Sequence, residues 1–402
     1  MFEQFQIPGD VAYLGLLFGL FVVPRFLQRY RIPSAATALA FGVTAGMGFA
    51  FPTDDPTVAV VASLGIVALF LFAGLDVRTS ELRRERVILV EHVVLRLVML
   101  AVSMAVISYI FGLNPRPSAL VALALITPST GFILDSLNRW GVSEAEQFWI
   151  RSKAIATELV ALAVLFVVLQ STSAARLGLS ALAIVVMIAV LPTVFRWLAS
   201  AVIPHAPNSE FGFLLMVAAA CAIITRQLGV YYLVGAFAVG MAAREFRRKL
   251  PIAASERMFG AVEAFAALFV PFYFFHAGLA LQREDLSLAA LSLGLAFTVV
   301  AIPFRLALTV VHRRWRLQER LQESLRVGVP MLPTTVFTLV LADILRQRYG
   351  IAPEIFGGLI IYTLINTVIP AFVMRAPAVT EFRDDILFVE HDAAHNDGQG
   401  LA

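Results

Sequence analysis

The chain is organised around the stretch WIRSKAIATELVAL, residues 149–162, which lies inside an apolar run from about Gln147 to Leu169. At ~1.5 Å per residue, a helix of this length crosses a hydrocarbon layer of ~30 Å. Glu158 then falls about halfway through the layer, where an isolated carboxylate is costly. The stretch therefore predicts a membrane-spanning helix with a functional acid near its centre.

The rest of the chain has the same apolar character. Of its 402 residues, 59% are hydrophobic, against an apolar fraction of roughly 45–50% in soluble domains, and the mean hydropathy is +0.83. The net charge of +3 does not indicate nucleic-acid binding, because the Arg residues stand in short clusters between apolar runs. A single cysteine, Cys221, excludes an intramolecular disulfide and a Cys/His metal site, and the N-terminus lacks a signal-peptide pattern. We expect an all-α polytopic membrane protein.

About thirteen apolar runs are long enough to cross a bilayer, on a requirement of ~17–25 residues each. The basic clusters follow odd-numbered spans, so all of them can face the cytoplasm together. This predicts a plasma-membrane protein with its N-terminus outside and its C-terminus cytoplasmic. A short tail, 377–402, is expected to be disordered. The expected spans are 11–29, 34–51, 57–77, 87–112, 117–138, 147–169, 177–203, 211–227, 229–244, 259–281, 286–311, 322–345 and 353–376.

Two of these spans carry helix breakers at comparable places. They lie seven spans apart, an odd offset, so they cross the membrane in opposite directions, as inverted-topology repeats do. A broken helix exposes backbone groups that need cover from protein or a water-filled cavity, and its half-helix ends and hydroxyls offer ion ligands. The alternative is that Pro and Gly merely kink both helices. The residues concerned are Thr127, Pro128, Ser129 and Thr130 in the fifth span, and Pro330, Pro333, Thr334 and Thr335 in the twelfth.

Glu158 is the main candidate for chemistry. Burial disfavours the charged form of a carboxylate, whereas a nearby cation favours it, so one buried acid can alternate between a proton and a metal cation. The alternative is a structural ion pair or a hydrogen-bonded neutral acid. Thr157 offers a hydroxyl ligand for the same cation, or simply bonds its own i−4 carbonyl.

Other intramembrane charges have auxiliary interpretations. Arg305 is a candidate counter-charge that pairs with Glu158 when no ion is bound, the alternative being an interfacial arginine. Lys153 lies off the face of Glu158 and is expected to reach the interface. Asp135 either lines an entry funnel or is a solvated acid at a helix end. Glu91 and His92 are expected to be solvated near a helix end, Arg96 and Glu263 to form unassigned structural pairs, and none of these shows metal-ligand or nucleophile–base spacing.

Three apolar segments carry a resemblance to a known family. Residues 64–76, LGIVALFLFAGLD, are similar to its third-span signature, and residues 229–240, GVYYLVGAFAVG, to a second glycine-rich segment. Residues 271–279, PFYFFHAGL, match a third. Together they make the chain resemble the cation/proton antiporter superfamily, closest to the bacterial sodium/hydrogen-exchanger branch that also contains Kef-type proteins. The similarity covers nearly the whole chain.

This resemblance implies a transmembrane domain over residues 1–376, with thirteen spans and two broken helices that cross near the ion site. It also implies elevator-type alternating access, with an ion-translocating core that includes 87–170 and 286–376, and a separate dimerisation part. Thr127 to Gly131 match the first broken helix, Thr157 and Glu158 the acidic pair, and Arg305 the basic residue of the eleventh span. The chain departs from the family in having Thr157-Glu158 where two polar or acidic residues ending in Asp are usual, and Thr334-Thr335 where an Arg-Gly-Glu type sequence is common.

From these observations we expect a homodimeric secondary transporter that exchanges a monovalent cation, Na⁺ or K⁺, for H⁺. With one carboxylate the exchange is expected to be electroneutral, and neither a cofactor nor an enzymatic activity is expected, for want of a catalytic constellation. Two alternatives stay open. One is a transporter of the same architecture for an organic anion or another solute, bound by Arg305 and half-helix ends. The other is a transport-inactive sensor or assembly protein.

Overall fold

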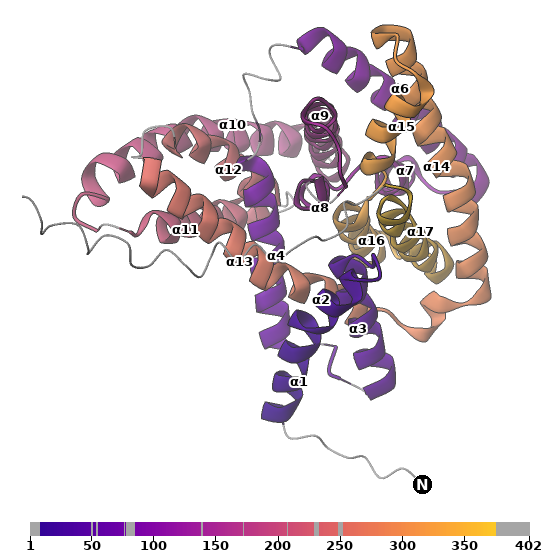
Figure 1. Ribbon diagram of the computed structural model, residues 1–402, viewed down its shortest axis with the longest axis horizontal. Helices are drawn as coiled ribbons and strands as arrows, with labels where there is room; N and C mark the ends of the chain where they lie inside the picture. The colour runs from indigo at the N-terminus through magenta and orange to yellow at the C-terminus, as the bar shows by residue number, and fades with distance from the viewer. Residues whose placement is uncertain are drawn as a thin grey trace, which may run out of the picture.

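A computed structural model describes residues 9–49, 51–53, 55–75, 77, 85–137, 140–171, 173–206, 208–228, 233–247 and 252–374. These residues form helices joined by short connections, in agreement with the all-α prediction (Figure 1). The helices are α1 (Gly9–Phe21), α2 (Val23–Gln28), α3 (Ser34–Phe49), α4 (Pro56–Leu75), α6 (Arg86–Phe111), α7 (Pro115–Ile126), α8 (Thr130–Ser136), α9 (Glu144–Gln170), α10 (Ala174–Trp197), α11 (Glu210–Gln227), α12 (Leu233–Arg247), α13 (Ile252–Leu279), α14 (Leu288–Leu317), α15 (Leu321–Gly328), α16 (Thr335–Tyr349) and α17 (Pro353–Val373).

Within the described residues, nine helices are long and apolar enough to cross a membrane, and ten if the bent pair Leu321–Met331 and Thr335–Tyr349 forms one span. Three of the expected spans correspond to shorter apolar helices, at Tyr13–Gln28, Ser34–Phe49 and Leu233–Arg244. Exposed valine and leucine side chains cover α6 and α10. Such faces are rare on soluble monomers and fit a lipid environment.

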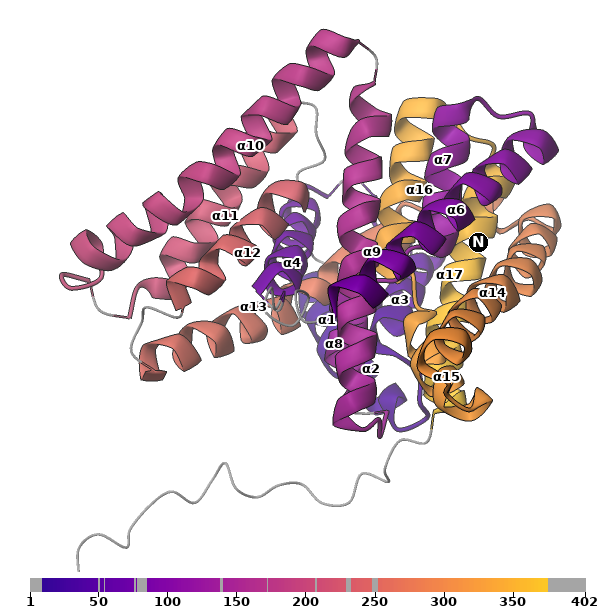
Figure 2. The same cartoon turned by 90° about the horizontal axis from the view of Figure 1, so that it is seen from above.

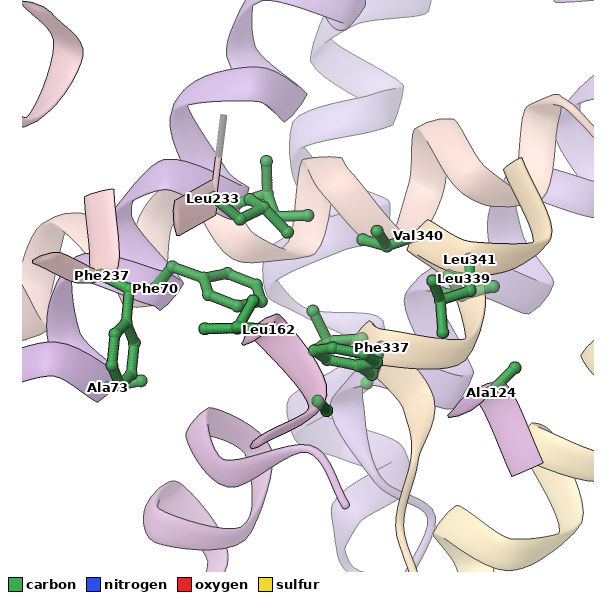
Figure 3. Close-up of a cluster of buried hydrophobic side chains, with 14 of the residues drawn as sticks. Phe70, Ala73, Ala124, Leu162, Leu233, Phe237, Phe337, Leu339, Val340 and Leu341 are labelled. Carbon is green, nitrogen blue, oxygen red and sulfur yellow. The ribbon is translucent and has the colours of Figure 1, made fainter. Parts of the chain in front are cut away.

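The helices gather into two groups with α4, α8 and α9 between them. In both views α10, α11 and α12 lie on one side, and α6, α7 and α14 to α17 on the other (Figures 1 and 2). The packing within each group follows this division: α12 packs on α10 and α11 in one group, and α14 packs on α17 in the other. α4, which lies between the groups, packs on α12 and α13. Apolar side chains also join elements across it, as Figure 3 shows for Phe70 of α4, Ala124 of α7, Leu162 of α9, Leu233 and Phe237 of α12, and Phe337 of α16.

Glycines allow α4 and α12 to touch backbone to backbone. A Cβ atom on Gly240 would lie 2.3 Å from the carbonyl oxygen of Leu71, and one on Gly74 would lie 2.3 Å from that of Phe237. Any other residue at these positions would push the two helices apart. Two of the apolar motifs singled out in the sequence therefore meet at one helix crossing.

Local sequence signals position the helix ends near the candidate site. Ser143 and Glu146 form a capping box at the start of α9, with reciprocal bonds of 2.7 Å and 3.3 Å between backbone N–H groups and side-chain oxygens. Pro128 ends α7, because proline disfavours helical geometry in the residue before it, and Thr127 is extended at φ −83° and ψ 119°. The chain enters helical geometry again at Thr130, the start of α8.

Candidate functional site

The two predicted breaks meet inside the protein. The backbone N–H of Ser129, in the first break, donates to the carbonyl of Pro333 in the second at 2.8 Å. The Ser129 hydroxyl accepts hydrogen bonds from the N–H groups of Val336 (2.8 Å) and Phe337 (3.3 Å), at the start of α16. The first break thus supplies the N-terminal cap of the helix that follows the second break.

Threonines of the second break bond to α17 and α7. Thr334 donates its N–H to Asn366 Oδ1 at 3.1 Å and accepts from Asn366 Nδ2 at 2.9 Å. Thr335 bonds to Thr367, and Thr338 donates to the carbonyl of Ala124 at 2.7 Å. Thr334 and Thr335, predicted as part of the ion site, hold the break in place here, and neither lines the cavity described next.

Glu158 faces a small cavity at the breaks. It lies on α9 and is 3% exposed, and the centre of a water molecule can occupy about 10 Å³ of the cavity, which is room for roughly one water. Ser129, Thr130 and Gly131 of the first break line it, and Thr130 is the polar neighbour of Glu158 through its hydroxyl and its amide. Leu69, Phe70 and Ala73 of α4, with Val336 and Phe337 of α16, complete the lining.

Two oxygens at this cavity lack a hydrogen-bond partner. They are Glu158 Oε2 and Thr130 Oγ1, both buried. No cation of the described part of the chain forms an ion pair with Glu158. Buried polar atoms in native proteins are nearly always paired, so two orphans that share a cavity indicate a ligand site. Oxygen ligands of this kind suit a hard cation such as Na⁺.

Arg305 lies at the second break and not at the cavity. It is 2% exposed on α14. Its Nη2 donates to the carbonyl of Met331 at 2.6 Å, and its Nη1 to that of Leu332 at 2.8 Å. Nη1 also donates to Tyr362, whose hydroxyl donates to the carbonyl of Leu125 at 2.5 Å. Its charge therefore compensates carbonyls of the second break directly and reaches the end of α7 only through Tyr362, and its pairing with Glu158 in another state stays a prediction.

Thr157 points away from the cavity. Its hydroxyl donates to the carbonyl of Lys153 at 2.8 Å, so the contact of 3.1 Å with His92 Nε2 is one in which the histidine donates. Thr157 as a cation ligand stays a prediction. The expectation that His92 is solvated is wrong: it is 3% exposed, because it lies against α9.

The structure also corrects the placement of Lys153. Its side chain is fully buried and its amine lies 3.5 Å from His312 Nδ1, so it does not reach the interface as expected. Thr127 is buried at the end of α7 but does not line the cavity. Pro330 belongs to the short 3₁₀ turn Val329–Met331, and Pro333 accepts from Ser129. The side chain of Asp135 lies outside the described residues.

Sequence reasoning missed the polar face of α17. Tyr362, Thr363, Asn366 and Thr367 are all buried and bond to the breaks. Their spacing of one and four residues places them on one helix face inside an apolar span, and this pattern was the available signal. Among the described residues, no three His, Cys, Asp or Glu side chains are placed to hold a resident metal ion.

Comparisons with known proteins agree with this geometry. Residues 16–378 match the family described as sodium/hydrogen exchanger, transmembrane. The chain is 24% identical over 381 residues to the Na⁺/H⁺ antiporter NhaS5 of Synechocystis, covering 90% of this chain and 53% of that protein, so it spans about half of that relative's length. It is also 24% identical over 366 residues to probable Na⁺/H⁺ antiporter 3 of Methanocaldococcus jannaschii, covering 89% and 93% of the two chains.

Solved structures show the same fold. The sodium proton antiporter MjNhaP1 of Methanocaldococcus jannaschii at pH 8 superposes with a TM-score of 0.67 at 15% identity, covering 90% of this chain and 95% of that one. An electron-microscopy structure of the same antiporter gives a TM-score of 0.64 at 17% identity, covering 90% and 94%. The family match spans most of the chain and the fold agrees with it. The chain belongs to the sodium/hydrogen exchanger family of membrane transporters.

Proposed function

We propose that the protein exchanges Na⁺ for H⁺ across a membrane and that Glu158 carries both ions in turn. One observation carries the proposal: Glu158 is buried at a cavity of single-ion size with a carboxylate oxygen that has no partner. A charged carboxylate in such a place is strongly unfavourable unless a proton or a cation neutralises it. The two ions therefore compete for one site.

The cation ligands follow from the cavity lining. Glu158 supplies the charge and Thr130 a hydroxyl oxygen. Because one carboxylate accepts either one proton or one Na⁺, the site has the same charge with either ion bound. We therefore propose electroneutral exchange of one ion for one proton. The relatives whose names specify Na⁺ support Na⁺ over K⁺ as the cation.

The membrane arrangement belongs to the same proposal. Counting the nine long helices, the bent pair and the three shorter apolar helices gives thirteen spans. An odd count allows the basic clusters to face the cytoplasm together, with the N-terminus outside. We further propose a homodimer, an inverted-repeat core and elevator-type access. The anion-transporter alternative loses its main support, because both Nη atoms of Arg305 are already bonded within the protein.

Proteoliposomes containing a trapped pH dye test the carrier assignment. Addition of Na⁺ to the wild type should change the internal pH, and Glu158→Gln should abolish the response, because an amide releases and accepts no proton near neutral pH and has no negative charge to balance Na⁺. Glu263→Gln is the matched control, since Glu263 is an exposed acid on α13. Li⁺ and K⁺ added in turn identify the cation. Equal transport by Glu158→Gln and wild type would contradict the assignment.

A further inference from the structure

A second group of buried titratable side chains lies between α6, α9 and α14, outside the cavity. α6 packs against both of the other helices (Figure 2). Lys153 of α9 is fully buried, and His312 of α14 is 3% exposed. His92 and Arg96 of α6 and Arg313 of α14 are buried around them. The ion site described above uses none of these groups.

Lys153 is an amine without a carboxylate partner. Within the described residues, its Nζ has one polar contact, His312 Nδ1 at 3.5 Å, and it lies 5.9 Å from the centre of the Trp149 ring. Arg313 and Arg96 add positive charge around it, which the carboxylate of Glu319 offsets in part. An ammonium group buried among cations is poorly stabilised, so a neighbouring base takes its proton readily.

His312 is that base, and its two ring nitrogens face different partners. Nδ1 faces Lys153, while Nε2 lies 3.3 Å from Glu91 Oε2. The Glu91 side chain is 33% exposed and is also held by Arg316 Nε at 3.2 Å. A histidine with a donor on one side and a carboxylate on the other can accept a proton at one nitrogen and release one from the other. The three groups form a line from the interior to the surface.

The inner end of this line lies on the same helix as Glu158, on a different face. Lys153 precedes Glu158 by five residues on α9, a rise of about 7.5 Å along the helix. The carbonyl of Lys153 accepts from Thr157, and Thr157 in turn contacts His92, whose ring centre lies 6.3 Å from that of His312. The cavity and the polar line are therefore attached to the same turns of α9.

We propose that Glu91, His312 and Lys153 form a proton relay that connects Glu158 to the solution at the α6–α14 side. The inference rests on the proposed exchange and adds the route of the proton. When Na⁺ replaces the proton on Glu158, water carries that proton to the neutral Lys153 amine. An N–H bond of the resulting ammonium breaks as one forms at His312 Nδ1, and the Nε2 proton passes to the Glu91 carboxylate and then to water. No electron is transferred, and the same steps run in reverse when Na⁺ leaves Glu158 to that same side.

The surrounding charges favour this direction of transfer. Arg96 of α6 and Arg313 of α14 face Lys153, and Arg313 is paired with Glu319 at 2.8 Å. Glu146 and Glu323 also act on Arg313, and the charged groups that act on His92 are Arg96, Lys153, His312 and Arg313. The positive charges of Arg313 and Arg96 at the inner end and the carboxylate of Glu91 at the outer end move a proton outward from Lys153.

Two exchange modes of the same proteoliposomes test the relay. Na⁺/H⁺ exchange is followed with the trapped dye, and Na⁺/Na⁺ exchange with radioactive sodium at equal pH on both sides, a mode that requires no proton movement. Glu91→Gln and His312→Gln remove the proton-accepting groups while keeping similar volume. His205→Gln, at an exposed histidine whose ring bonds to the carbonyl of Ala201 on its own helix turn, is the matched control.

We expect both relay variants to slow Na⁺/H⁺ exchange by about 10- to 100-fold and to change Na⁺/Na⁺ exchange by no more than about twofold. An equal fall in both modes would show that the line is structural, and no fall in either would show that protons take another route. Either result would contradict the relay, but neither would contradict Na⁺/H⁺ exchange by the wild type. A wild type that exchanges no protons would instead overturn the proposed function, and the relay with it.

Discussion

The hydroxyl of Ser129 caps the N-terminus of α16 through the N–H of Val336, at 2.8 Å and across 207 residues of sequence. This bond fixes the two breaks to each other at the wall of the cavity, because both residues also line it. Cavity shape and fold stability therefore depend on the same side chain.

Ser129→Ala is expected to destabilise the protein by about 1–3 kcal/mol, because it leaves buried N–H groups of α16 without an acceptor. Thermal unfolding in detergent measures the effect. Ser63→Ala, which removes a hydroxyl bonded only within α4 on an exposed face, should change stability by less than about 0.5 kcal/mol. Equal effects of the two variants would show that the cap has no energetic role.

Thr130→Val should separate cation binding from stability. The Thr130 hydroxyl is buried next to Glu158 but makes no hydrogen bond of ordinary geometry, so its replacement by a methyl group of similar size should change the unfolding temperature little. Loss of one ion ligand should raise the Na⁺ concentration for half-maximal exchange by about tenfold. Unchanged Na⁺ dependence would exclude Thr130 from the ligand set.

Arg305→Lys is expected to cost about 1–3 kcal/mol, because a single ammonium group cannot reproduce the planar fork that bonds Met331, Leu332 and Tyr362. The unfolding temperature and the exchange rate should fall together. A variant that retains full stability would show that charge alone, and not the fork, is required at this position.

Gly240→Ala is expected to destabilise the protein by about 1–3 kcal/mol through the clash of its new Cβ with α4. Gly178→Ala on α10 is the control, because a Cβ there meets open space and should stabilise the helix by about 0.5–1 kcal/mol. Thermal unfolding of the two variants compares them. A tolerated alanine at Gly240 would mean that α4 and α12 can separate without cost.

Acid should remove one contact between α1 and α4. Burial alone would raise the pKa of Asp55, but hydrogen bonds from Tyr13 (2.6 Å) and from the N–H of Val58 (2.9 Å) outweigh it and lower the pKa below the usual 3.8. A carboxyl with a lowered pKa stabilises the fold above its unfolded value and loses that contribution as the pH falls through its folded value. Tyr13→Phe should therefore be less stable than wild type at neutral pH, and the difference should shrink below about pH 4. A difference that does not change with pH would contradict this contact.

Much of the fold was readable from the sequence, and the predicted sodium/hydrogen exchanger family is confirmed. Breaker residues located both helix breaks, and the burial expected of Glu158 follows from its place in a long apolar run. The glycines of the predicted motifs proved to be positions of helix contact, which a pattern alone does not explain. The bonding partners of the buried charged side chains were harder to predict, because they depend on how the helices pack.

Arg305 and Lys153 illustrate that limit. Both were recognised as intramembrane charges, yet the carbonyls that engage Arg305 become available only where two breaks meet. Lys153 was expected at the interface because sequence spacing cannot show that α14 covers it. The sequence shows which residues are charged, but it does not show which groups will bond to those charges in the fold.

The cavity has a polar side and an apolar side, and the two come from different helices. Its polar side chains come from the first break and α9, whereas α4 contributes only Leu69, Phe70 and Ala73. The side chains of α4 therefore provide no ligand to a cation bound at Glu158. If α4 slides along α9, the ion keeps its entire coordination shell and only the solution that it can reach changes, so access to the site can evolve at α4 independently of affinity.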